Sequence, residues 1–264
     1  MKIQGKSLLD RQQEEISTEK ALKDLGDFSQ IKALQFKERT EFIDQTLWTC
    51  FSSSVLKLSQ LQVLFIYIQM TTSLEMSPSE NSFIDFFSGL KNLQNLRVFT
   101  FHIYYHYHYH KDFKRVKGNK IFLTVCEALQ DLKGLEKLDF SYPWIPSPNS
   151  DIAGLTNVLT SLRKLESFSF HFDVNRSVQP IENDVFMGFV KALCCLKAMK
   201  NFTINLDMKE ISEISEEIVL LLFRCFKERK VEFSLTLSSR DIDWKAAKRL
   251  TQLSNRIIVC PQKK

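Results

Sequence analysis

The sequence predicts an α/β fold built from stacked segments, each running helix, turn and strand. One spacing of apolar residues, in steps of three, three, three and two, recurs along the chain. Its period changes within each copy from the three-residue step of a helix end and turn to the two-residue alternation of a strand. Because neither the helix nor the strand of one copy could bury its apolar face alone, successive copies must stack and share one core.

The core positions follow directly from this spacing. Four copies match it at five positions each: Leu90, Leu93, Leu96, Phe99 and Phe101; Leu129, Leu132, Leu135, Leu138 and Phe140; Leu159, Leu162, Leu165, Phe168 and Phe170; Leu193, Leu196, Met199, Phe202 and Ile204. Copies before and after these four are less regular. The strands are expected around residues 64–68, 99–103, 138–142, 168–172, 202–206 and 233–237. Every second residue of a strand points inward.

Helices are expected between the strands, with polar residues at their starts. Ser79, Ser150 and the pair Asn183 and Asp184 precede apolar helical stretches. Their side-chain oxygens can accept hydrogen bonds from the backbone N–H groups that a helix start leaves without partners. A further helix is expected from Glu41 to Ser54.

Composition indicates a globular intracellular protein. Lys and Arg outnumber Asp and Glu by 36 to 31, a net charge of +5 over 264 residues, which is too mild for a dedicated nucleic-acid binder. The longest apolar run, Ile218 to Phe223, is about a third of the roughly 20 residues that cross a bilayer. The first twenty residues are polar and mixed in charge, unlike a secretory signal. We therefore expect a cytoplasmic protein without a membrane segment.

The six cysteines contain no Cys-x-x-Cys pair and are expected to be reduced and mostly buried. Cys194 and Cys195 lie in the helical apolar stretch FVKALCCLKAM. They are interpreted as small core residues rather than as a redox or soft-metal pair.

The stretches LQDLKGLEKLDF and LTSLRKLESFSF resemble the leucine-rich repeat family, and the resemblance covers roughly residues 17–260. From residue 34 to residues 64, 99, 138, 168 and 202 the successive distances are 30, 35, 39, 30 and 34, long enough for a helix in every repeat. This length is similar to that of the ribonuclease-inhibitor-like branch. The resemblance implies a horseshoe solenoid of about seven to eight irregular repeats, with parallel strands on the concave face and helices on the convex face. Residues 1–16 would be a polar N-terminal segment or cap.

In such a fold a partner would bind on the concave face, which the alternation assigns to small polar residues around one aromatic pair. The candidate partner-binding residues are Phe65, Tyr67, Thr100, His102, Asp139, Ser169, His171, Thr203 and Asn205. Aromatic anchors among hydrogen-bonding groups suit a protein partner. The competing possibility is that the helix from Glu41 to Ser54, or the segment from Met1 to Gly26, folds over Phe65 and Tyr67 as a cap.

The sequence favours a non-enzymatic protein-interaction scaffold, either a monomer or a subunit of a larger complex. With seven glycines it has no phosphate-binding glycine motif, and it has no zinc-protease His-Glu-x-x-His motif. One possible acid–base arrangement is a row of His102, Asp139 and His171 on neighbouring strands. No cofactor is expected. The alternatives are a substrate-recognition subunit of an assembly such as a ubiquitin ligase and, third, an RNA-binding protein using the basic, tyrosine-rich loop at residues 104–120.

The stretch HIYYHYHYH places His106, His108 and His110 at every second residue. It falls in the longest interval between strands, 39 residues from Phe99 to Leu138, and is therefore interpreted as an insertion at a loop. Three alternating histidines could contribute ligands to Zn²⁺, but three at this spacing rarely converge on one ion, and only Asp112 is near enough in sequence to orient them. No metal site is predicted.

We expect purified protein to hold well below stoichiometric zinc. Replacing His106, His108 and His110 together with alanine should shift the melting temperature by no more than about 2 °C, because exposed loop side chains contribute little to stability. Elemental analysis and thermal unfolding of both proteins check this. One zinc per chain that is lost in the triple variant would contradict the prediction.

Overall fold

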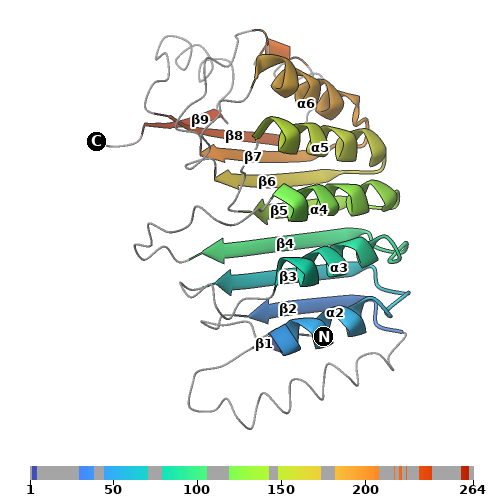
Figure 1. The fold of residues 1–264 in the computed structure, drawn as a ribbon. Helices are drawn as coiled ribbons and strands as arrows, with labels where there is room; N and C mark the ends of the chain where they lie inside the picture. The colour runs from blue at the N-terminus through green and yellow to red at the C-terminus, as the bar shows by residue number, and fades with distance from the viewer. Residues whose placement is uncertain are drawn as a thin grey trace. The chain divides into compact units, whose positions relative to one another are not determined.

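The computed structural model is an α/β fold in which parallel strands alternate with helices (Figure 1). It describes residues 2–4, 30–38, 45–70, 79–105, 119–142, 148–173, 182–207, 232–239 and 257–261, together with residues 217, 220, 221 and 224. The chain divides into two compact units, Met1–Leu135 and Glu136–Lys264. The predicted alternation of helices with parallel strands is confirmed within each unit.

The N-terminal unit contains strands β1 (Lys2–Gln4), β2 (Ala33–Glu38), β3 (Val63–Met70) and β4 (Val98–Tyr105), with helices α2 (Gln45–Val55), α3 (Glu80–Leu90) and α4 (Asn119–Asp131). Its strands pair in parallel in chain order. In Figure 1 these helices lie on one face of the strands.

The C-terminal unit contains β5 (Lys137–Tyr142), α5 (Pro148–Ser161), β6 (Ser167–Asp173), α6 (Asn183–Cys195), β7 (Asn201–Asp207), β8 (Glu232–Ser239) and β9 (Ile257–Pro261). These strands also pair in parallel in chain order. Helices α5 and α6 lie on one face of β5, β6 and β7 (Figure 1).

Backbone hydrogen bonds explain why leucines recur at every third residue before a strand. The amide of Leu93 donates to the carbonyl of Leu90, and that of Leu96 to the carbonyl of Leu93, each at 2.9 Å. Bonds that span three residues make a tight turn, in which side chains three apart lie on the same side. All three leucines are buried. The same bond joins Leu58 to Val55, Leu61 to Leu58, Leu132 to Leu129, Leu135 to Leu132, Leu165 to Leu162, Leu196 to Leu193 and Met199 to Leu196.

One carbonyl just before a strand accepts two amides from the start of the next strand. The carbonyl of Gln62 accepts from the amides of Arg97 at 2.8 Å and Val98 at 3.0 Å. Because one carbonyl accepts two hydrogen bonds, the register is fixed, and Leu64 pairs with Phe99. The same arrangement joins Lys32 to Gln62 and Val63, Glu136 to Glu166 and Ser167, and Glu166 to Lys200 and Asn201.

Constant register places the phenylalanines of successive strands beside one another. Phe168 and Phe202 have ring centroids 6.0 Å apart with planes 16° apart, and Phe140 and Phe170 are 6.1 Å and 8° apart. These rings are buried. Stacked aromatic pairs add to the free energy gained from apolar burial.

The core of the N-terminal unit forms where α2 and α3 meet the strands. Phe51 of α2 stacks on Phe36 of β2 with centroids 4.2 Å apart. The ring centroids of Trp48 and Phe83 are 4.7 Å apart. The indole N–H of Trp48 donates to the carbonyl of Ser82 at 3.2 Å. The buried indole therefore keeps a hydrogen-bond partner, as a buried polar group requires.

A side-chain amide joins the starts of neighbouring helices in both units. Gln45 Oε1 accepts from the amide of Ser79 at 2.7 Å, and Gln45 Nε2 donates to Ser82 Oγ. In the C-terminal unit Asn149 Oδ1 accepts from the amide of Glu182 at 2.8 Å and Asn149 Nδ2 donates to Glu182 Oε1 at 3.1 Å. Each clasp satisfies a backbone amide at a helix start and fixes one helix against the next.

The predicted helix starts are partly correct. Ser79 caps α3, with Ser79 Oγ accepting from the amide of Ser82 at 3.3 Å. Ser150 instead lies inside α5, which begins at Pro148, because proline suits the first helical turn, where an N–H would lack an intrahelical partner. Glu182 rather than Asn183 is the cap residue of α6, and no side chain bonds the cap.

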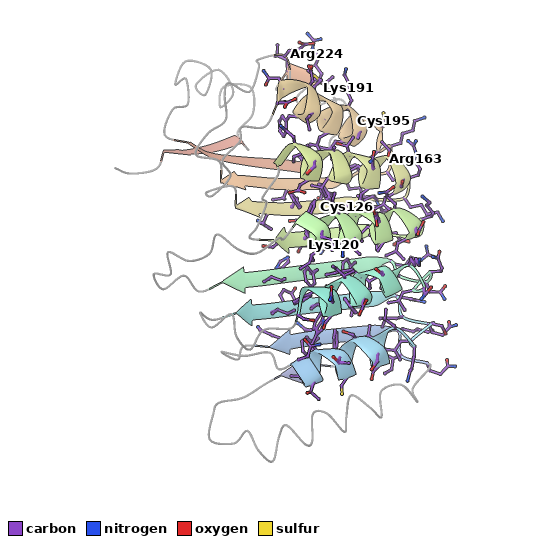
Figure 2. The ribbon with its side chains drawn as sticks, viewed as in Figure 1. Lys120, Cys126, Arg163, Lys191, Cys195 and Arg224 are labelled. Carbon is purple, nitrogen blue, oxygen red and sulfur yellow. The ribbon has the colours of Figure 1, made fainter. Side chains whose placement is uncertain are left out.

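Residues 2–4, which belong to the segment 1–16 interpreted as a polar segment or cap, form β1, in which Ile3 pairs with Phe36. One other sequence expectation changes. Cys195 is exposed and Cys194 half-buried, so neither is the core residue expected. Both cysteines lie at the end of α6, where Ala192 and Leu193 take the buried positions. The cysteines therefore lie toward the solvent side of the helix. Figure 2 labels Cys195 and Lys191 on this helix.

Phe168 and Ser169 test the assignment of inward and outward faces. Phe168 is 1% exposed among aromatic neighbours, so Phe168→Ala should lower the free energy of unfolding by roughly 3 to 5 kcal/mol. Ser169→Ala should lower it by less than about 1 kcal/mol. Chemical denaturation of both variants measures the difference, and equal losses would show that the faces are assigned wrongly.

Gly134 lies against the guanidinium of Arg97. A Cβ at residue 134 would clash with Arg97 Nη1, which donates to the Gly134 carbonyl at 2.9 Å. We expect Gly134→Ala to destabilise the protein by about 1 kcal/mol, since it displaces the guanidinium from this bond. In an Arg97→Ala background the same glycine substitution should cost less than half as much. A double-mutant cycle measured by denaturation checks this, and equal costs in the two backgrounds would exclude the coupling.

Candidate partner-binding face

The strand residues that alternate with the core lie on the face opposite the described helices, here called the helix-free face. In the N-terminal unit its described side chains are Ala33, Gln35, Lys37, Val63, Phe65, Tyr67, Val98, Thr100 and His102. In the C-terminal unit they are Lys137, Asp139, Ser141, Ser167, Ser169, His171, Asn201 and Thr203.

Two rows of paired residues cross the N-terminal unit at Phe65 and Tyr67. Phe65 pairs with Gln35 on one side and Thr100 on the other. Both aromatic side chains are half-buried. They therefore keep part of their surface available to a partner, together with the neighbouring half-buried Val63.

The second row runs from Lys37 through Tyr67 to His102. The Tyr67 ring meets the His102 ring edge-on, with centroids 5.2 Å apart and planes at 79°. This contact fixes the direction of the tyrosine ring on the sheet. An aromatic side chain that is already ordered loses little conformational entropy when a partner covers it.

Thr100 and His102 are not open contact residues, contrary to the sequence expectation. Thr100 is 1% exposed and His102 is 8% exposed. The alternation gives the face on which a residue lies, whereas its exposure also depends on the size of its neighbours. Here the larger Phe65 and Tyr67 stand directly beside the two residues in the register. His102 is thus a buried neighbour that contacts the Tyr67 ring.

Helix α2 does not cover this aromatic pair. Its Trp48 and Phe51 are buried against each other, with ring centroids 5.6 Å apart, and Phe51 packs on Phe36, which alternates with the helix-free residues of β2. The possibility that the helix predicted at Glu41–Ser54 caps Phe65 and Tyr67 is therefore wrong for the part that the structure describes. Residues 5–29 lie outside the described residues.

The C-terminal unit presents a polar helix-free face. Ser169 Oγ and His171 Nε2 form a hydrogen bond of 3.3 Å along β6. Asp139 and Thr203 flank Ser169 in the register, and all three side chains are partly exposed. These groups can donate and accept hydrogen bonds to a partner's backbone or polar side chains.

The predicted row of His102, Asp139 and His171 is wrong in its register. Asp139 pairs with Ser169, whereas His171 pairs with Ser141 on β5 and, by backbone position, with Asn205 on β7. Asp139 therefore lies two residues before Ser141, the residue of β5 that is level with His171. His102 belongs to the N-terminal unit.

Within the described residues no group of three His, Cys, Asp or Glu side chains could hold a metal ion. His106, His108 and His110 lie outside the described residues, as does most of the loop at 104–120 considered for RNA. Among the helices that the structure describes, none has the length and apolar character needed to cross a membrane.

Lys37 is the residue that sequence reasoning left out of the candidate site. It is half-buried, pairs with Tyr67, and is the charged member of the described helix-free side chains in the N-terminal unit. The sequence signal for this residue is a cation at the position that pairs with Tyr67 on the neighbouring strand. The repeated spacing places residues 37 and 67 on the same face of the sheet.

A scan against protein-family models finds no match to this chain, and a search of curated proteins finds no significantly similar sequence.

Proposed function

We propose that the chain is a leucine-rich repeat protein of the ribonuclease-inhibitor-like branch, and that it is a non-enzymatic scaffold for a protein partner. Support for the family comes from the apolar residues at three-residue spacing, which are buried and are joined by backbone hydrogen bonds that span three residues, except that the amide of Leu162 donates to Val158 rather than to Leu159. Parallel strands with helices on one face are compatible with it. In this proposal the helix-free face is the concave wall of a horseshoe.

The observation that carries the functional proposal is the pair of half-buried aromatic residues, Phe65 and Tyr67, on a face that no described helix covers. Aromatic side chains are enriched among the residues that dominate binding free energy at protein interfaces. The polar residues around Ser169 supply hydrogen-bonding groups of the kind that surround such anchors. A non-enzymatic scaffold for a protein partner is the function that these features favour.

The partner is to be sought with the full chain as bait, and the double variant Phe65→Ala with Tyr67→Ala tests the site. We expect the double variant to lose about 2 kcal/mol or more of binding free energy, roughly 30-fold in Kd. It should lose less than about 2 kcal/mol of stability, because both side chains are only half-buried. Calorimetric binding to the purified partner and thermal unfolding give the two values.

Ser167→Ala with Thr203→Ala is the matched control, because both residues lie on the helix-free face of the C-terminal unit. Partner binding that survives in the aromatic double variant but fails in this control would move the interface to the polar strands. Binding unchanged in both variants would contradict an interface on the helix-free face.

A further inference from the structure

The charge of the helix-free face differs between the two units. In the N-terminal unit no described position of this face holds an acidic residue, and Lys37 gives it a positive charge. In the C-terminal unit Lys137 and Asp139 occupy successive positions of the face on β5, so both signs are present.

Lys37 places an ammonium group next to the aromatic pair. Among the described residues no carboxylate forms an ion pair with it, whereas in the C-terminal unit Lys200 Nζ pairs with Glu166 Oε2 at 2.6 Å. Its side chain is half-buried beside the aromatic pair. A cation next to an apolar surface interacts more strongly with an opposite charge when a ligand excludes water than it does on an open surface.

The geometry of a parallel sheet sets the distance between anchor and charge. Lys37 and Tyr67 are paired on adjacent strands, which lie about 4.8 Å apart. An extended peptide advances about 3.3 Å per residue. A carboxylate one or two residues from an apolar side chain could therefore reach Lys37 while that side chain covers Phe65 or Tyr67.

We propose that the N-terminal unit binds an acidic segment of a partner protein, in which Asp or Glu stands one or two residues from an aromatic or aliphatic anchor. The inference rests on the proposed function and adds the chemical class of its ligand. The apolar side chain of the segment lies on Phe65 and Tyr67, and its carboxylate pairs with the Lys37 ammonium. Opposite charges raise the association rate and select against basic segments.

The test uses the full chain and three fluorescein-labelled nine-residue peptides that differ only in their flanking charge. Each has a central Phe flanked on both sides by two Glu, two Gln or two Lys residues, and binding is followed by fluorescence anisotropy at two salt concentrations. We expect the Glu peptide to bind at least tenfold more tightly than the Gln peptide, and the Lys peptide to bind most weakly. The advantage of the Glu peptide should shrink as salt rises.

Lys37→Glu should reverse the order, so that the Lys peptide binds most tightly, and Lys37→Gln should bring the Glu and Gln peptides to within about threefold. Lys91→Glu is the matched control: this exposed lysine follows α3 in the same unit, and its substitution makes the same change in net charge. It should leave the order intact. Thermal unfolding confirms that each variant is folded, and Lys37→Gln keeps the test valid if Lys37→Glu does not fold.

The remaining outcomes separate the two proposals. Peptides that lose binding in the Phe65→Ala, Tyr67→Ala variant but keep their order in Lys37→Glu would overturn the acidic ligand and leave the aromatic anchor standing. Peptides that bind that double variant as they bind the native chain would overturn both. Absence of binding by every peptide at millimolar concentration would overturn the inference, as would an oligouridylate that outcompetes the Glu peptide at Lys37.

Discussion

The fold depends on a backbone carbonyl just before a strand. This carbonyl accepts hydrogen bonds from two consecutive amides at the start of the next strand. At Gln62 these amides belong to Arg97 and Val98. A parallel sheet has no hairpin turn to set its register, so another contact has to define which residues pair. Because one acceptor holds two consecutive amides, a slip by one residue would break both bonds and turn every side chain to the other face.

The buried side chains and the helix clasps follow from that register. Phenylalanines can stack from strand to strand, as Phe168 does on Phe202, only if each strand begins at the same level. The side-chain amides of Gln45 and Asn149 hold the starts of α2, α3, α5 and α6, and these helices end in the leucine turns. These four helices are thus fixed at both ends. The two-residue alternation of the strands then decides which side chains the core leaves for solvent or a partner.

The core could be predicted from the sequence, because burial of Leu90, Leu93 and Leu96 requires only a period, and the hydrogen bonds that create this period are local. Features that depend on neighbours could not be read in this way. The burial of Thr100 comes from the residues beside it on other strands. The start of α5 at Pro148, in contrast, follows from a local preference, because proline favours the first helical turn. The mismatch of Asp139 with His171 shows that a face can be assigned correctly while a row across strands is not.

Specificity on such a surface has to come from few groups. Phe65 and Tyr67 are half-buried before any partner binds, so covering them removes less apolar area from water than covering fully exposed rings would. The rigid sheet offsets part of this deficit, because an ordered surface loses little entropy on binding. Discrimination between partners then depends on charge, because a mismatched charge at an interface costs more binding free energy than the loss of one apolar contact. Lys37 lies where such discrimination acts, on the face opposite the core and beside the anchor, so its charge can select a ligand without altering the packing that fixes the strands.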